Sequence, residues 1–122
     1  MKIYTSYYAK ARKIPDDIVR ISIAGKAPTG YTGLEYKKVA PKIGFFLEWK
    51  KNKDNAYYIE HYNTEVLTNL NAKQVYLDLE RLSNGNDCVL LCYEKPTDFC
   101  HRHLIADWLS HELSIEVNEW SE

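Results

Sequence analysis

Hydrophobic residues along the chain alternate between strand-like and helix-like spacing. Residues 2–7 and 18–23 are rich in β-branched and aromatic residues, which favour β-strands. Residues 88–93 are apolar on both faces, as expected of a central parallel strand that helices cover on each side. Residues 114–118 alternate between apolar and polar positions and predict a short edge strand. We therefore expect four strands, with the third at the centre of the sheet.

Helical patterns fill the region between the second and third predicted strands. Residues 43–51 indicate a short helix, and Asp54 is a suitable N-cap for a longer one. Asn71 opens a further helix within an approximate capping box. Asn84 and Gly85 then supply a left-handed stop before the third strand begins.

The order strand, strand, helices, strand, helix, strand predicts a three-layer α/β fold. We expect a small, mostly parallel sheet flanked by helices, in a Rossmann-like arrangement. A chain of 122 residues has the usual size of one domain, so we expect residues 1–122 to form a single domain. Residues 24–41 contain three glycines and two prolines and predict a long connection, which is often functional or mobile.

Composition narrows the class of protein without naming an activity. The chain is 45% hydrophobic and 27% charged, and its formal net charge of -1 gives no general attraction to nucleic acid or to an anionic membrane. No secretory signal follows Met1, and no apolar run approaches the roughly 20 residues of a membrane span, so we expect a cytoplasmic protein without membrane contact. Three cysteines are an odd number, which disfavours a disulfide framework. The pattern does not indicate an oligomeric state.

The turn after the third predicted strand carries most of the chemistry. Thr97 or Asp98 can cap the helix that follows, which places Cys100 in its first turn. A thiol there, beside His101 and Arg102, is in a position to have a lowered pKa. The same helix start with an arginine also suits a phosphate or carboxylate ligand. Reactivity and anion binding are therefore competing interpretations of one geometry.

A parallel sheet brings the carboxyl ends of its strands to one edge, where α/β proteins usually bind ligands. We expect a pocket floored by these strand ends and closed by residues 24–41. Glu94 beside Arg102 would form a structural ion pair or a general acid or base held by one. The candidate catalytic residues are Glu94, Cys100 and His101, and the candidate substrate-binding residues are Thr5, Ser6, Arg20, Ser22, Cys92 and Arg102.

Structural interpretations compete with these functional ones. Cys88 and Cys92 are most simply small core residues, because free cysteine is among the most buried residue types. Cys100 fits core packing as well as it fits function. Arg102 can tie the turn together instead of holding a ligand. His103 falls on the outward side of the last helix and is expected to be a solvated surface residue.

Three sharper motifs do not fit the chain. A cysteine phosphatase loop needs an arginine six positions after its nucleophile, but Asp98 stands six positions after Cys92. A phosphate-binding Walker loop needs Lys and Ser/Thr after its second glycine, and the chain has no such sequence after Gly30. Zinc could in principle use Cys92, Cys100, His101 and His103, but the sequence has no C-x-x-C pair. Adjacent helical residues also diverge by roughly 100°, so they rarely bind one metal together. We therefore expect no metal and no other cofactor.

Three short segments of the C-terminal third resemble those of one known protein family. Residues 90–96 read Leu-Leu-Cys-Tyr-Glu-Lys-Pro, residues 100–102 read Cys-His-Arg, and residues 106–109 read Ala-Asp-Trp-Leu. This combination resembles the signature of the family called domain of unknown function 488 (DUF488). The resemblance implies a small α/β protein of bacterial or phage type with a Cys-Glu-Lys and Cys-His-Arg pocket, and it implies no activity.

Two functional hypotheses follow. The first is a small enzyme or ligand-binding protein for an anionic substrate, a nucleotide or nucleic-acid component, with Cys100 or Glu94 as nucleophile or base and His101 as acid/base partner. Arg102 would hold the anion. The alternative is a non-catalytic module that binds nucleic acid or a protein through a basic face, unless that face is merely solvated. This face comprises Lys37, Lys38, Lys42, Lys50, Lys51 and Lys53, with Tyr31, Tyr36 and Trp49 between them.

Overall fold

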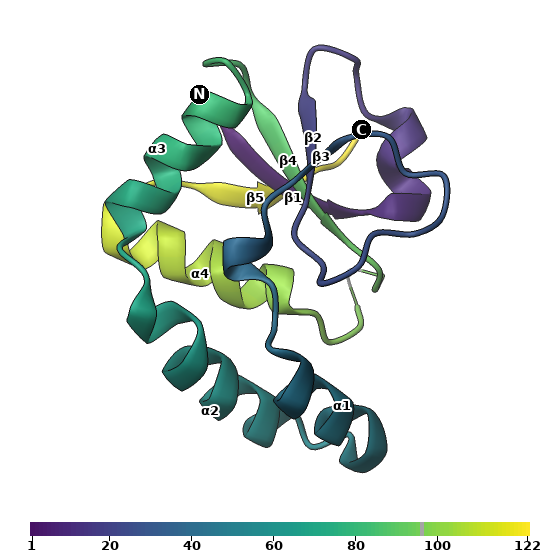
Figure 1. Cartoon of the computed structure of the whole chain (residues 1–122). Helices are drawn as coiled ribbons and strands as arrows, with labels where there is room; N and C mark the ends of the chain where they lie inside the picture. The colour runs from purple at the N-terminus through teal and green to yellow at the C-terminus, as the bar shows by residue number, and fades with distance from the viewer. Residues whose placement is uncertain (96) are drawn as a thin grey trace.

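The computed structural model describes residues 1–95 and 97–122, so Pro96 of the DUF488-like motif lies outside the described residues. Its sheet is parallel throughout and has the strand order β3-β2-β4-β1-β5 (Figure 1). The strands are β1 (Ile3–Tyr7), β2 (Val19–Ser22), β3 (Leu34–Glu35), β4 (Cys88–Cys92) and β5 (Val117–Glu119).

Helices cover both faces of this sheet. Helices α3 and α4 pack on one face, and the 3-10 helix η1 lies on the other, which confirms the expected three-layer α/β fold (Figure 1). The α-helices are α1 (Ile43–Asn52), α2 (Asn55–Glu65), α3 (Ala72–Leu82) and α4 (His101–Leu113), and the 3-10 helices are η1 (Tyr8–Lys13), η2 (Lys37–Val39) and η3 (Leu67–Asn69).

Strand β4 is the central strand that its apolar sequence predicts. Cys88, Leu90 and Cys92 face the core under α4, whereas Val89 and Leu91 face a smaller core under η1. All five side chains are buried. The period of two along a strand sends neighbouring residues to opposite faces, so a strand covered on both sides must be apolar at every position.

The predicted helix boundaries in the middle of the chain are confirmed by their caps. Asp54 accepts a hydrogen bond from the backbone N–H of Tyr57 at 3.2 Å, and Asn71 accepts one from Gln74 at 3.0 Å. After α3 the backbone turns left-handed at the predicted Asn-Gly stop, with φ of 56° and 80°.

Three local predictions need correction. The residue at the N-cap position of α4 is Cys100, not Thr97 or Asp98, and its side chain makes no capping hydrogen bond. The connection over residues 24–41 is not free of regular structure, since it contains β3 and η2. The last strand begins three residues later than expected and pairs with β1, which supplies the partner that its short sequence lacks on its own.

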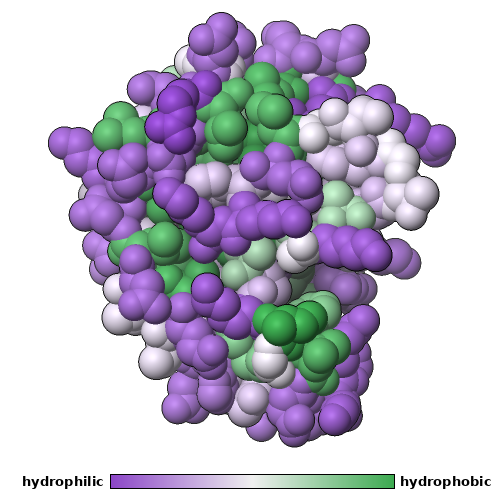
Figure 2. All heavy atoms as spheres, in the orientation of Figure 1, coloured by the Kyte–Doolittle hydropathy of each residue, from purple (hydrophilic) through white to green (hydrophobic). Residues whose placement is uncertain are grey.

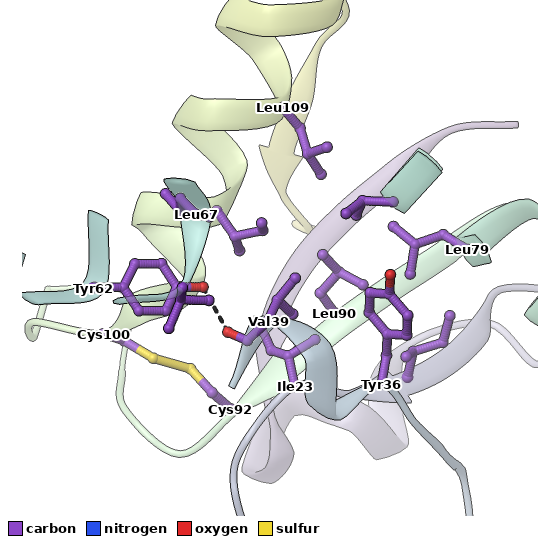
Figure 3. Close-up of a cluster of buried hydrophobic side chains, with 14 of the residues drawn as sticks. Ile23, Tyr36, Val39, Tyr62, Leu67, Leu79, Leu90, Cys92, Cys100 and Leu109 are labelled. Carbon is purple, nitrogen blue, oxygen red and sulfur yellow. Dashed lines mark hydrogen bonds between the residues drawn. A yellow bond between two sulfur atoms is a disulfide. The ribbon is translucent and has the colours of Figure 1, made fainter. Parts of the chain in front are cut away.

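Two buried tyrosines fix this connection over the sheet edge. The Tyr62 hydroxyl of α2 donates to the Val39 carbonyl at 2.6 Å (Figure 3), and the Tyr36 hydroxyl donates to the Asp78 carboxylate of α3 at 2.6 Å. Burial raises the pKa of Tyr62 well above its ordinary value, so its hydroxyl stays a donor at neutral pH. The connection is therefore held close to the ends of β2 and β4.

Among the described residues, none of the helices is both long and apolar enough to cross a membrane.

Candidate functional site

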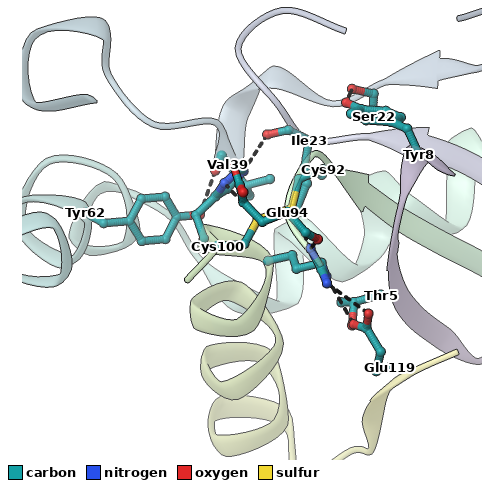
Figure 4. Close-up of a disulfide and its surroundings, with 12 residues drawn as sticks. Thr5, Tyr8, Ser22, Ile23, Val39, Tyr62, Cys92, Glu94, Cys100 and Glu119 are labelled. Atoms are coloured by element: carbon teal, nitrogen blue, oxygen red, sulfur yellow. Dashed lines mark hydrogen bonds and ion pairs between the residues drawn. A yellow bond between two sulfur atoms is a disulfide. The ribbon is translucent and has the colours of Figure 1, made fainter. Parts of the chain in front are cut away.

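A disulfide joins the end of β4 to the start of α4. The sulfurs of Cys92 and Cys100 are 2.02 Å apart, with their Cα atoms at 7.4 Å (Figure 4). The expectation that an odd cysteine count disfavours a disulfide is wrong for this pair, because the turn brings residues eight positions apart into contact. Cys88 is free and buried as predicted, and burial raises the pKa of its thiol to about 12.

Arg102 is fully buried directly beside this disulfide. Its guanidinium donates to both carboxylate oxygens of Glu119 at 3.1 and 2.9 Å, to Cys92 Sγ at 3.0 Å and to the Glu94 carbonyl at 2.6 Å (Figure 4). Thr5 also donates to Glu119, at 2.6 Å. The ion pair expected between Arg102 and the Glu94 side chain is not formed, and Glu94 is exposed. Most N–H donors of the guanidinium therefore already have partners within the chain.

His101 lies next to the Cys100 sulfur of the disulfide. Its Nε2 atom is 2.7 Å from the Ile23 carbonyl oxygen, and its Nδ1 atom is 3.9 Å from Cys100 Sγ. A carbonyl oxygen can only accept, so this contact assigns the proton to Nε2 and leaves a lone pair on Nδ1. Burial, against the opposing effect of the Ile23 hydrogen bond, lowers the pKa of His101 to about 4. The ring is therefore neutral at pH 7, with its basic nitrogen directed toward a sulfur.

Three predicted substrate-binding residues lie away from this group. Arg20 donates to four backbone carbonyls within residues 11–18, and Ser22 shares a 2.6 Å hydrogen bond with Tyr8 (Figure 4). The Ser6 hydroxyl is buried without a partner among the described residues. Strand alternation sends all three side chains toward the η1 face, opposite to Cys92. The structure does not bring them together with the disulfide.

His103 differs from its expected place on the solvated surface. Its ring is only partly exposed, and its Nε2 atom is buried without a hydrogen-bond partner among the residues that the structure describes. Burial is the main cause that lowers the pKa of this histidine. His103 therefore belongs to the packed face of α4.

A cavity of about 780 Å³ opens over the disulfide. Its walls are aromatic: the ring centroids of Trp49 and Tyr58 are 5.5 Å apart, those of Trp49 and Phe99 5.6 Å, and those of Tyr58 and Phe99 4.9 Å. Cys92, Cys100 and His101 line the cavity as well. The aromatic residues that line it are Phe46, Trp49, Tyr58, Tyr93 and Phe99.

The rim of the cavity is positively charged. Among its described lining residues, five lysines face one acidic residue, Glu94. Lys53 Nζ lies 4.5 Å above the Trp49 ring, and Lys50 Nζ lies 5.3 Å above the Phe46 ring. In Figure 2, hydrophobic side chains gather over the region of α1 and are bordered by hydrophilic ones. The five lysines are Lys26, Lys37, Lys42, Lys50 and Lys53.

Several of these lysines and Trp49 belong to the predicted basic face, but no local sequence pattern connects that face with the cysteine turn. Tyr58 is not among the predicted site residues. The available signal was the spacing of Phe46, Trp49, Lys50 and Lys53, which is i, i+3, i+4 and i+7 and therefore marks one helical face. That pattern combines rings and charges, so hydrophobicity alone does not reveal it.

No curated protein and no solved structure matches the chain. A family model described as the active DUF488-N3 subclade matches residues 3–113. This match spans strands β1 to β4, the aromatic helices and the disulfide turn, and it ends before β5. The chain belongs to the DUF488 family.

Proposed function

We propose that the cavity over the disulfide binds a nucleotide or another nucleic-acid-derived anion. The observation that carries this proposal is the joint lining of five lysines, one glutamate and five aromatic side chains. Bases stack on aromatic rings, and lysine ammonium groups attract phosphate. The chain as a whole has a net charge of -1, so this concentration of positive charge is local.

The size of the cavity supports a small ligand. About 780 Å³ falls within the roughly 300–1,000 Å³ of typical small-molecule pockets. Lys50 on α1 and Lys53 directly after it lie at the rim and suit the phosphate, whereas Trp49 and Phe99 form a wall that suits the base. A phosphate at the rim and a base against the wall would bring the ligand over the disulfide.

Lys50 and Lys51 provide a matched test of this proposal. Both are exposed on the last turn of α1, but only Lys50 is among the lining residues. We expect Lys50→Glu to weaken the binding of nucleoside phosphates about tenfold, because it places a negative charge beside the phosphate. A tenfold change in the dissociation constant corresponds to about 1.4 kcal/mol of binding free energy. Lys51→Glu should leave the dissociation constant within about twofold, because exposed charges away from the ligand are largely screened.

Isothermal titration calorimetry at low and high salt measures the dissociation constants of both variants. The ligands are nucleoside mono-, di- and triphosphates and short single-stranded oligonucleotides. Binding should weaken as salt rises. Equal losses in the two variants, or no binding of any of these ligands, would contradict the proposal.

The catalytic form of the proposal requires reduction of the disulfide. A thiol reductant would first convert the disulfide to two cysteine thiols. Cys100 would then pass its proton to the lone pair on His101 Nδ1, 3.9 Å from Cys100 Sγ in the oxidised chain, as its sulfur attacks an electrophilic carbon of the bound ligand. The bond from that carbon to its leaving group would break, and the leaving group would take the proton from His101. Glu94 stands at the rim and is free of the ion pair once expected of it, so it is positioned to serve as acid or base.

We expect Cys100→Ser to abolish turnover of a bound ligand and Glu94→Gln to slow it by roughly 10²–10⁴-fold, the range of general acid–base effects. Mass spectrometry of reduced protein incubated with each binding ligand detects product or a covalent adduct. Cys88→Ser is the control, since Cys88 is buried and free and does not line the cavity. Full activity in both site variants would end the catalytic form. Binding without turnover would favour the non-catalytic module.

A further inference from the structure

The floor of the cavity brings three metal-ligand atoms together. The sulfurs of Cys92 and Cys100 and a ring nitrogen of His101 lie within 4.8 Å of one another, and all three side chains are buried. We propose that the reduced chain binds one zinc ion, or another thiophilic divalent cation, through these three atoms. Two thiolates and one imidazole form a known ligand set for zinc with an open fourth position.

Cys100 lies outside the helical geometry that disfavours metal binding by adjacent residues. Neighbouring residues within a helix diverge by roughly 100°, but Cys100 precedes α4 and has extended backbone angles, with φ of -153° and ψ of 143°. Its side chain can therefore approach the same point as that of His101. Cys92 comes from the end of β4, so no C-x-x-C pair is needed.

His101 is already oriented as metal-bound histidines are. Such histidines usually donate their second ring N–H to a carboxylate or a backbone carbonyl, which fixes the tautomer and the ring. Here Nε2 is 2.7 Å from the Ile23 carbonyl, and Nδ1 is the atom near the Cys100 sulfur. The nitrogen without a proton is thus the one that faces the cysteines.

The metal needs the dithiol form. A thiol reductant gives two electrons and two protons to the Cys92–Cys100 bond, and two molecules of that thiol become one disulfide. The divalent cation then displaces both cysteine protons, and two thiolates neutralise its charge. The Cα separation of 7.4 Å leaves room for the sulfurs to move apart around an ion.

The surroundings also favour negative charge on the sulfurs. Arg102 Nη1 donates to Cys92 Sγ at 3.0 Å, and Glu119 holds the guanidinium in place from its other side. The three ligand residues line the cavity, so the fourth metal position would face it and accept water or a ligand atom. A bound ion uses the Cys100 thiolate and the His101 lone pair, so metal binding and nucleophilic attack by Cys100 are alternative states.

This inference concerns the same cavity but does not depend on nucleotide binding. Its test uses Co²⁺ without any nucleotide, because thiolate ligands give cobalt an intense charge-transfer absorption. Reduced, anaerobic protein is titrated with Co²⁺, and Zn²⁺ is then added to displace it. We expect one equivalent to bind to reduced wild type and to reduced Cys88→Ser, and none to the oxidised chain.

Cys92→Ser and His101→Ala should each lower the affinity at least about a hundredfold, since each removes one of three ligands; loss of a mere supporting partner costs about 10–100-fold. Circular dichroism checks that the variants fold. Lys50→Glu should bind the metal normally, which separates this result from the proposed nucleotide site. Absence of the charge-transfer band in reduced wild type, which involves no substitution, would overturn the inference. So would an undiminished band in a folded Cys92→Ser variant.

Discussion

Arg102→Met is expected to lower the free energy of unfolding by about 3 kcal/mol, the lower end of the range for breaking a buried ion pair. The lower end applies because one quarter of the Glu119 side chain is exposed, whereas Arg102 is completely buried. Without the guanidinium, the Glu119 carboxylate keeps only the Thr5 hydrogen bond among the described residues, and the Glu94 carbonyl and the Cys92 sulfur lose a donor. One residue thus connects β4, β5 and the turn before α4.

Urea unfolding under non-reducing conditions measures this loss. Arg12→Met is the matched control, because Arg12 is exposed and has no ion pair among the described residues, so its change should stay within about 0.5 kcal/mol. Similar shifts in the unfolding midpoint of the two variants would contradict the structural role of Arg102.

Acid should destabilise the chain through His101. Its pKa is about 4 in the folded chain, against an ordinary value of 6.5, and burial is the main cause. Between these values the unfolded chain binds a proton that the folded chain does not. The free energy of unfolding therefore falls as pH drops from 6.5 toward 4, by about 3 kcal/mol in total, and this contribution is constant above pH 6.5.

The His101→Gln variant separates this effect from other titrations. Glutamine can still donate to the Ile23 carbonyl but does not titrate, so the variant should lose most of the slope between pH 6.5 and 4. Burial also lowers the pKa of His103, which contributes with the same sign and persists in the variant. His111→Gln, a histidine substitution at an exposed position of α4, is the matched control. Parallel pH profiles for wild type and His101→Gln would contradict the assignment.

Much of the fold could be predicted because local chemistry and tertiary structure agree. The doubly apolar β4 lies at the centre of the sheet, and Asp54 and Asn71 cap the helices as expected. The order of the strands could not be read in the same way, since it depends on which edges meet in space. Strand β3 has two residues and no strong pattern of its own, and it forms because β2 offers it a partner.

Part of the candidate site could be predicted because its residues are close together in the sequence. Cys92, Cys100 and His101 converge because they flank one turn, which sequence proximity reveals. Arg20 and Ser22 are predicted to line the pocket as well. In a sheet that is covered on both faces, however, the alternation of side chains along a strand does not indicate which face binds the ligand. Arg20 instead satisfies backbone carbonyls under η1.

Glu119 shows the limit of sequence reasoning most clearly. It lies 17 residues after Arg102, on β5. The pairing of β5 with β1 positions Glu119 beside Arg102. Glu94 is closer in sequence and was the expected partner, yet only its carbonyl meets the guanidinium. A charge pair can be assigned from sequence only where both partners belong to one local element.

An NMR titration of the ¹⁵N-labelled chain with a nucleoside monophosphate tests the proposed nucleotide site without any substitution. Trp49 lines the cavity, whereas Trp120 packs on the opposite face of the sheet. We expect the indole N–H of Trp49 and the backbone amides of Gly25 and His101 to shift with saturation, and the indole of Trp120 to remain in place. No shift at millimolar nucleotide, or shifts confined to the Trp120 face, would contradict a nucleotide site over the disulfide.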